Sequence, residues 1–244
     1  SSMLFPRMGS RAVRRWAAAL AAVLALPMAG AVSGAEPADP LEPVNRKVFA
    51  FNDAFDTWLL KPVAQGYDKV TPQPVKSGIS NVFDNAATPG IALNQLLQGK
   101  PRAALSDFTR FLVNTTVGIG GIFDIASRNG LPRHEEDFGQ TLAVWTGGQG
   151  AFITLPGRGP SSVTHAIGMV GDAFTNPVML ITPIRDRIAV TALNIVDIRA
   201  DLLSSERLIS GDEYLFIRDA YLQRRSYLIN DGQVEEDPFL DEDF

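Results

Sequence analysis

The chain has 244 residues, of which 22 are basic and 27 acidic, and its formal net charge at pH 7 is −5. An acidic chain is a poor partner for nucleic acid, because the phosphates that dominate such binding attract lysine and arginine. The sequence contains no cysteine, which excludes disulfide bonds and thiolate metal sites from it.

The first 35 residues have the order typical of a secretory signal peptide. An uncharged, alanine-rich run from Trp16 to Ala35 follows four basic residues: Arg7, Arg11, Arg14 and Arg15. Small residues near the end of the run suit a signal cleavage site. A retained membrane anchor is the alternative interpretation, although the run is about as short as a membrane span can be. We expect residues 1–35 to be a signal peptide.

The segment after a proline-rich lead-in carries an apolar stripe at helical spacing, formed by Val48, Phe51, Phe55 and Trp58. Pro62 is expected to end or kink this helix. Residues 75–97 continue as an apolar segment that we expect to break at Pro89-Gly90. Gly99 and Pro101 then mark a helix end and a new helix start.

The helix that starts at Pro101 runs into the stretch FLVNTTVGIGGIF (111–123), which has no charged residue. The stretch is too short to cross a bilayer as a helix. Its glycines at 118, 120 and 121 are expected to end the helix and let the chain turn. A buried helix end with a tight turn in the core is the simplest interpretation.

The middle of the chain is harder to assign. Residues 128–139 are charged and predict a loop. Residues 140–156 alternate weakly around Gly147, Gly148 and Gly150, which favours a flexible hairpin. Residues 157–162 predict a second loop.

The last third of the chain is predicted to be helical. Helices are expected over 163–174 and 188–203, with prolines interrupting the chain between them. Ser210 and Glu213 have the spacing of a capping box that opens a helix to residue 229. The acidic tail, 233–244, is expected to be mobile. These patterns predict an all-α chain.

Motifs of enzyme and metal sites give weak signals. The histidines, His134 and His165, lack a metal-ligand spacing, and the run RHEEDF (133–138) is better explained as a solvated charge run. The chain has no G-x-S-x-G nucleophile motif, and GIGG (118–121) lacks the Lys-Ser/Thr ending of a phosphate loop. We therefore predict no catalytic residue, no metal site and no cofactor.

Patterns typical of membrane-bound helices give a stronger signal than the enzyme and metal motifs. The stretch VFAFNDAFDTWLL (48–60) holds three phenylalanines and a tryptophan within thirteen residues. Such a stripe is either a buried core face or the face of a helix that lies in a membrane interface, and periodicity does not separate the two. Asn45 and Asn52 lie on one side of that helix. Their amides either make cap-like local bonds or face a wet path or lipid headgroup.

Six blocks in order carry a resemblance to a known family: DPLEPVNRKVFAFN, KPVAQGYDKVTPQPVKSGISNVFDN, FTRFLVNTTVGIGGIFDIA, DFGQTL, LPGRGPSS and IRDAYLQRRSYLINDG. On these blocks the chain resembles the MlaA (VacJ) family of Gram-negative outer-membrane proteins over residues 39–232. We expect residues 36–232 to form one MlaA-like helical domain.

The resemblance implies an architecture and a role. Family members look like a ring of amphipathic helices in the inner leaflet of the outer membrane, around a central amphipathic channel. Phospholipids misplaced in the outer leaflet would enter this channel and pass to a periplasmic carrier similar to MlaC, which maintains lipid asymmetry. The resemblance also implies trimeric porins as partners and no enzyme activity. A soluble periplasmic lipid carrier and a porin-associated structural protein are the alternatives.

The resemblance also assigns residues. Phe51 and Asn52 fall in an element of the first helix that controls lipid flow, and the segment 145–150 matches a glycine-rich hairpin that gates the channel. The turn in 111–123 becomes a re-entrant bend in one leaflet. The candidate channel and gate residues are Asn45, Phe51, Asn52, Asn114, Thr115, Gly118, Gly120, Gly121, Trp145, Gly147, Gly148 and Gly150.

Two departures from the family pattern stand out. Many members carry a lipobox cysteine that anchors them to the membrane, and this sequence has none. We therefore expect an exported protein that holds the outer membrane through its apolar surface. Members often have an Arg-Asp pair where this chain has THAIG (164–168), so the role of that pair here stays open.

Overall fold

The computed structural model describes residues 39–208 and 211–233 of the chain. The predicted signal peptide lies outside the described residues, as does the predicted acidic tail apart from Gln233. All elements described below belong to one unit that begins at Pro37.

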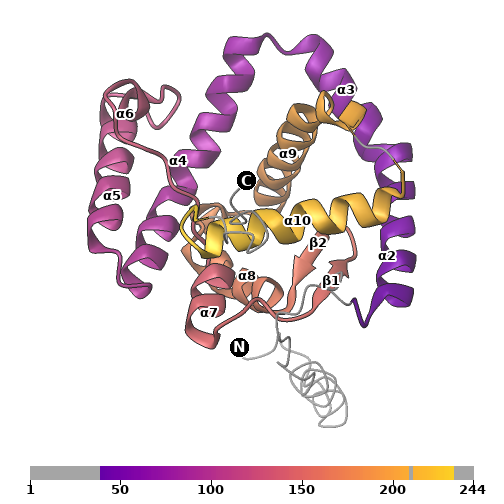
Figure 1. Ribbon diagram of the computed structural model, residues 1–244. Helices are drawn as coiled ribbons and strands as arrows, with labels where there is room; N and C mark the ends of the chain where they lie inside the picture. The colour runs from indigo at the N-terminus through magenta and orange to yellow at the C-terminus, as the bar shows by residue number, and fades with distance from the viewer. Residues whose placement is uncertain (1–38, 209–210, 234–244) are drawn as a thin grey trace, which may run out of the picture. The chain divides into compact units, whose positions relative to one another are not determined.

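The described part of the chain opens with a long helical run. Helix α2 (Glu42–Phe55), the π-helical turn η1 (Asp56–Leu60) and helix α3 (Lys61–Val70) follow one another without a gap (Figure 1). Pro62 lies in the first turn of α3, directly after the π-helical turn, and the helical run continues through it. The π-helical turn is tied to α9 because Arg199 donates through Nε and Nη2 to Asp56, each at 2.7 Å.

Helix α4 (Gln73–Leu97) and helix α5 (Pro101–Thr116) lie side by side (Figure 1). The predicted break at Pro89-Gly90 is wrong, because α4 continues through it. Pro89 deprives one carbonyl of its helical donor, but packing against α5 supports the turns on both sides. Gly90 instead allows a close approach, since a Cβ there would lie 2.9 Å from Thr175 Oγ1.

The assignment of residues 140–162 differs from the prediction. After the short helix α6 (Ile125–Arg128) and a loop, residues Phe138–Thr146 form helix α7. The hairpin follows it, with β1 (Phe152–Leu155) antiparallel to β2 (Gly159–Ser162). Asp137 caps α7 by accepting a bond from Gln140 N at 2.8 Å, so D-x-x-Q is the helix start that the weak alternation concealed.

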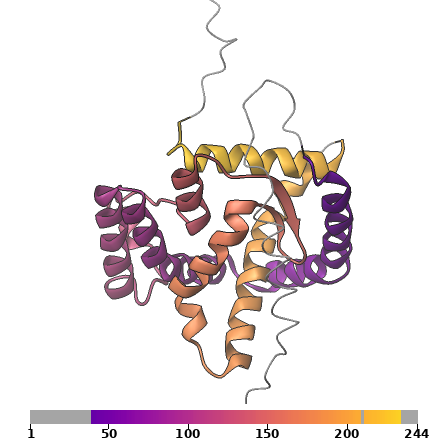
Figure 2. The same cartoon turned by 90° about the horizontal axis from the view of Figure 1, so that it is seen from below.

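The remaining elements confirm a helical C-terminal third. They are α8 (Val163–Thr175), the 3-10 turn η2 (Pro177–Leu180), α9 (Ile184–Leu202), the turn η3 (Ser205–Leu208) and α10 (Glu213–Ile229). Turn η2 joins α8 to α9 (Figure 2). The observed cap of α10 is Asp212, and the predicted cap Ser210 lies outside the described residues.

Helix α10 contacts α7 and β2. Within 39–208 and 211–233, no helix has the length and apolar character needed to cross a bilayer. The prediction of an all-α fold is confirmed, with the short β1–β2 hairpin as an addition.

Candidate functional site

The interior of the protein is polar. Among the described residues, the buried apolar side chains are six alanines together with Phe152 and Tyr214. The largest fully buried side chains are all polar: Gln95, Gln140, Asn94, Thr141, Asp107, Ser161 and Ser162. A water-soluble domain buries leucine, isoleucine, valine and phenylalanine instead, so this distribution is inverted.

The large apolar side chains lie on the outside. Trp58 is 84% exposed, Phe174 is 87% exposed and Leu180 is 80% exposed. Similar exposed side chains occur along α2 to α5 and along α8 and α9. Apolar surface of this extent is unfavourable in water at about 25 cal/mol per Å², and it marks a surface made to contact lipid or another apolar partner.

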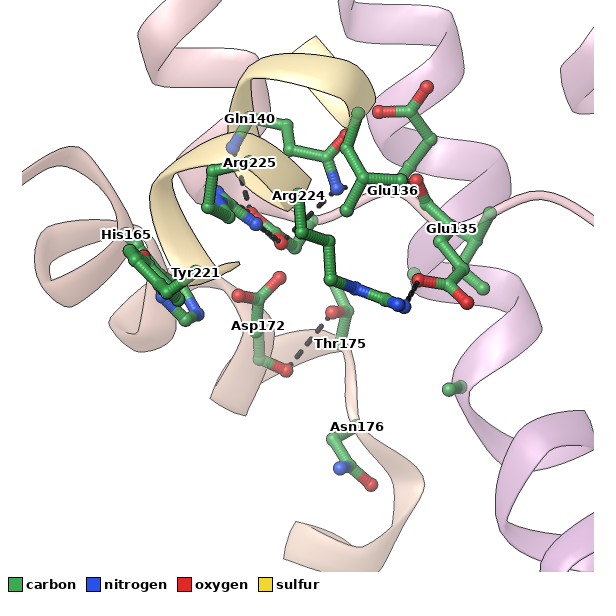
Figure 3. A pocket seen from close by; sticks show the side chains of 15 residues that line it. Glu135, Glu136, Gln140, His165, Asp172, Thr175, Asn176, Tyr221, Arg224 and Arg225 are labelled. Carbon is green, nitrogen blue, oxygen red and sulfur yellow. Dashed lines mark hydrogen bonds and ion pairs between the residues drawn. The ribbon is translucent and has the colours of Figure 1, made fainter. Parts of the chain in front are cut away.

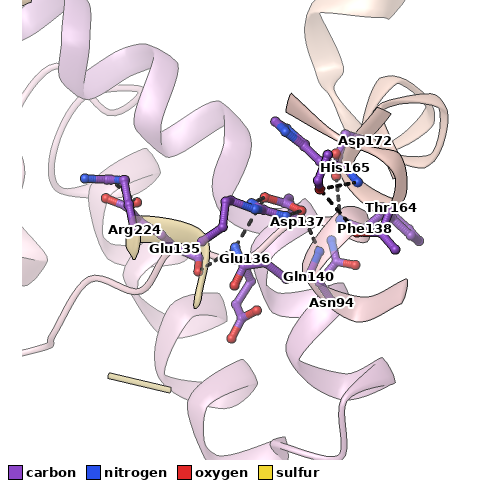
Figure 4. Close-up of polar contacts among 12 residues, drawn as sticks. Asn94, Glu135, Glu136, Asp137, Phe138, Gln140, Thr164, His165, Asp172 and Arg224 are labelled. Carbon is purple, nitrogen blue, oxygen red and sulfur yellow. Dashed lines mark hydrogen bonds and ion pairs between the residues drawn. The ribbon is translucent and has the colours of Figure 1, made fainter. Parts of the chain in front are cut away.

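Hydrogen bonds between side chains hold the polar interior together (Figure 4). Gln95 on α4 donates to Asp107 Oδ2 on α5 at 2.7 Å, and His134 Nδ1 lies 2.7 Å from the same oxygen. Thr141 on α7 donates to Asn94 Oδ1 on α4 at 2.8 Å. The network supplies partners to most of these buried polar groups, whereas some atoms, Gln95 Oε1 among them, have no partner among the described residues.

The predicted amides of α2 hold the hairpin. Asn45 Nδ2 donates to Phe152 O at 3.2 Å, and Asn45 Oδ1 accepts from Thr154 N at 2.9 Å. Asn52, seven residues further along α2, makes the same kind of pair. Its Nδ2 donates to Leu155 O at 2.9 Å, and its Oδ1 accepts from Gly157 N at 2.7 Å. Both amides are therefore occupied by backbone and do not face an open path.

Phe51 lies beside these amides in sequence but points away from the interior, with 59% of its surface exposed. The apolar stripe of α2 is therefore an outer face, which excludes the buried core face that periodicity left open.

The glycine turn after α5 is braced by a buried side chain. Asn114 Nδ2 donates to Asp124 Oδ1 at 3.0 Å, and its Oδ1 accepts from Ala126 N at 2.9 Å. Gly118 lies where a Cβ would meet Phe123 O at 2.3 Å. This stretch thus combines a tightly closed base with a tip whose apolar side chains are exposed: Val117, Ile119, Ile122 and Phe123.

Three further predicted residues belong to the same turn. Thr115 Oγ1 accepts from Asn85 Nδ2 at 2.9 Å. Gly120 and Gly121 have φ values of 67° and 93°, which glycine adopts without strain. A Cβ at Gly121 would also lie 2.6 Å from Asn85 Cβ.

The predicted gate residues lie before the hairpin and do not form its turn, which corrects their assignment. Trp145 is in the last turn of α7 and donates through Nε1 to Leu97 O at 3.1 Å. Gly147 has φ 74° and ends that helix, and Gly148 N bonds Ala143 O at 2.9 Å. Gly150 (φ 71°) then leads into β1.

A cavity of about 410 Å³ lies between α4, the start of α7, α8 and α10 (Figure 3). Part of its wall is apolar, with Ala87, Ile91 and Leu228. The rest carries charged and polar side chains: Glu135, Glu136, Asp137, Gln140, His165, Asp172, Tyr221, Arg224 and Arg225. None of the twelve predicted site residues lines it.

A second cavity, of about 680 Å³, shares Glu135, Glu136 and Leu228 with the first. Its wall includes Lys100, which pairs with Glu136 at 3.0 Å. Since the two cavities share these lining residues, they are neighbours.

The charges of the first cavity are mostly paired. Arg225 donates through Nη1 and Nη2 to both oxygens of Asp137, and Arg224 donates to Glu135. Burial alone would raise the pKa of Asp137, but the bonds from Arg225 outweigh it and leave that pKa lowered. Burial lowers the pKa of His165, and the Arg225 charge adds to this effect.

Asp172 behaves differently. It accepts a bond from Phe138 N at 3.0 Å, and burial raises its pKa to about 6. No lysine, arginine or histidine among residues 39–208 and 211–233 pairs with its carboxyl group.

Sequence reasoning missed these cavity residues because they come together from separate elements. Two local signals were present: the Arg224-Arg225 pair of α10 and the run RHEEDF (133–138). The interpretation of that run as solvated is wrong for Glu136 and Asp137, which pair with Lys100 and Arg225. The THAIG segment (164–168), whose role the sequence left undecided, contributes His165, whose Nδ1 lies 3.0 Å from Tyr221 OH. It also contributes Gly168, which packs so closely that a Cβ there would lie 2.1 Å from Gly139 N.

Comparisons with known proteins agree with this architecture. The family model described as MlaA lipoprotein matches residues 37–228. The intermembrane phospholipid transport system lipoprotein MlaA of Escherichia coli K12 is 34% identical over 203 residues, covering 81% of this chain and 80% of that protein. The protein of the same description from Haemophilus influenzae is 31% identical and covers 81% and 82% respectively.

A solved structure is also similar. It is described as "Structural basis for maintenance of bacterial outer membrane lipid asymmetry", and it has a TM-score of 0.70 and 34% sequence identity. The match covers 79% of this chain and all of that one.

Proposed function

Because the chain belongs to the MlaA family, we propose that it removes phospholipids from the outer leaflet of the outer membrane and so maintains the lipid asymmetry of that membrane. The lipids leave through an amphipathic channel within a ring of helices that lies in the inner leaflet. They pass to a periplasmic lipid carrier similar to MlaC. A trimeric porin is the membrane partner that holds the protein in place.

The observation that carries this proposal is the inverted distribution of side chains. Apolar residues such as Trp58, Phe174 and Leu180 face outward, whereas the interior is built from amides, hydroxyls and ion pairs. Lipid tails solvate the outer face, and a polar interior suits a path for lipid headgroups. Moving a charged headgroup through hydrocarbon costs many kcal/mol, and a polar wall lowers that cost.

Two elements are suited to control the path. The β1–β2 hairpin is held to α2 through Asn45 and Asn52, so releasing these bonds would free it to move. The glycine bend after α5 has an apolar tip that fits a re-entrant position in one leaflet. Irregular backbone is tolerated at membrane depth when protein shields it, and Asn114 provides that shielding at the base of the bend.

The experiment that tests the role measures phospholipid in the outer leaflet of cells that lack the gene. We expect an increase that the wild-type chain reverses. Fractionation separates the alternatives, because a soluble periplasmic carrier would leave the membrane, whereas a porin-associated structural protein would stay there without a lipid defect. An unchanged outer leaflet in deleted cells would refute the proposal.

A further inference from the structure

The cavity of about 410 Å³ has the two-sided lining that a phospholipid needs near its headgroup. Ala87 and Ile91 from α4 and Leu228 from α10 form an apolar wall on which acyl carbons can rest. The opposite wall carries both carboxylates and guanidinium groups. A ligand with charges of both signs beside an apolar portion matches this lining.

Most charges in the cavity already have a partner, and Asp172 is the exception. Glu135 is bound by Arg224, Asp137 by Arg225 and Glu136 by Lys100. Within the described part of the chain, no basic group is paired with Asp172, and its carboxyl group accepts one hydrogen bond, from Phe138 N. A half-buried carboxylate without an ion-pair partner is stabilised by a cation placed beside it.

Arg224 supplies the opposite charge. Its side chain is 65% exposed, and it bonds Glu135 through Nη2, which leaves Nε and Nη1 available. Figure 3 shows Arg224 and Asp172 in the wall of the same cavity, with the Arg224 guanidinium group turned toward Glu135. A ligand in this cavity that carries a phosphate and an ammonium, as a zwitterionic headgroup does, would find a side chain of opposite charge for each group.

Two deeply buried side chains of the cavity wall carry further polar atoms that a ligand could bind. Gln140 is 1% exposed and Arg225 is 5% exposed. Gln140 Oε1 and Arg225 Nε each lack a hydrogen-bond partner among the described residues. One is an acceptor and the other a donor, and a buried polar atom without a partner costs about 1–3 kcal/mol. The wall thus offers a ligand one free hydrogen-bond acceptor and one free donor.

We propose that this cavity is a headgroup seat that selects phospholipids with a primary amine, holding the ammonium on Asp172 and the phosphate on Arg224. This inference rests on the proposed lipid-transport function and names the lipid that the site prefers. An ammonium donates hydrogen bonds to a carboxylate, whereas a glycerol headgroup offers only hydroxyls, so an anionic phosphatidylglycerol leaves Asp172 uncompensated.

The experiment uses the full chain extracted from membranes in detergent and mixed with equal amounts of phosphatidylethanolamine and phosphatidylglycerol. Native mass spectrometry resolves the complex with one bound lipid. We expect about a tenfold preference for phosphatidylethanolamine in the wild type, the ratio that corresponds to about 1.4 kcal/mol. Asp172→Asn should abolish the preference, and it keeps the bond to Phe138 N because the amide oxygen still accepts.

Two control variants separate charge from position. Arg224→Gln should weaken binding of both lipids and leave their ratio unchanged, since both carry the phosphate. Asp53→Asn makes the same chemical change as Asp172→Asn at an exposed position on α2, and it should alter nothing. Adding water-soluble phosphoethanolamine should not change the ratio, because it lacks acyl chains for the apolar wall. Loss of the preference in its presence would overturn the assignment to a lipid.

The outcomes distinguish this inference from the function on which it rests. A wild type that binds lipid without preference, or an Asp172→Asn variant with the wild-type ratio, overturns the headgroup seat and leaves lipid transport standing. A wild type that binds neither lipid overturns both. The wild-type ratio is decisive by itself, whatever the folding of any variant.

Discussion

Replacing Asn45 by alanine should destabilise the protein strongly, because its amide is the partner of a buried strand edge. The side chain is 3% exposed and satisfies both Phe152 O and Thr154 N. Its loss leaves two buried backbone groups without partners, at about 1–3 kcal/mol each. We expect a loss of about 2–6 kcal/mol in the free energy of unfolding, which lowers the midpoint by roughly 4–24 °C.

Asn52 provides the matched control, since it makes the same pair of bonds from the same helix. Its partners, Leu155 O and Gly157 N, lie in a part of the hairpin that water reaches, so water can replace the amide. Asn52→Ala should therefore cost only about 1 kcal/mol. Thermal unfolding of both variants in detergent, followed by circular dichroism, measures the difference. If Asn45→Ala lowers the midpoint no more than Asn52→Ala, burial of the strand edge is not what makes the amide important.

Three further predictions concern the turns, the outer surface and the cavity. Gly118→Ala should unfold the bend, because its Cβ would lie 2.3 Å from a backbone oxygen, whereas Gly148→Ala meets nothing within 4 Å and should keep the wild-type melting temperature. Phe174→Asp and Leu180→Asp should reduce the membrane-bound fraction without changing the circular dichroism spectrum, since both side chains are exposed; retention of full membrane binding would contradict a lipid-facing surface. The raised pKa of Asp172, about 6 against 3.8, means that the folded state holds a proton more tightly than the unfolded state. Wild-type stability should therefore fall as the pH rises from about 4 to 6, and Asp172→Asn should lack that part of the pH dependence in thermal melts.

Helical periodicity in the sequence was enough to predict most of the helices, but not the environment of their faces. The stripe that includes Phe51 and Trp58 was correctly read as one side of a helix, and the structure places it outside. A protein core and a lipid tail are equally apolar, so the spacing of the residues carries no information about which of them a face contacts. Only the tertiary structure, with polar groups on the other side, resolves it.

The cavity was beyond sequence reasoning for a different reason. Asp137, Asp172 and Arg225 come from the start of α7, from α8 and from α10, and each belongs to a locally ordinary segment. The weak alternation in residues 140–156 resembles that of a hairpin, and the cap formed by Asp137 and Gln140 is the local signal that marks a helix instead. A short helix with glycines at its end resembles a loop when its cap is overlooked.

An inverted protein faces a problem that amide side chains solve. A two-stranded hairpin has open edges, and an unpaired backbone group in contact with lipid costs several kcal/mol. Asn45 and Asn52 each present a donor and an acceptor, so they pair with the edge of β1 without adding a charge to the interior. Polar side chains that are hydrogen-bonded in this way have few free donors or acceptors for a lipid headgroup. A headgroup therefore binds to them weakly and can move on. The Asp172 carboxyl group has no ion-pair partner among the described residues, so it is the group in the cavity wall that we propose distinguishes one headgroup from another.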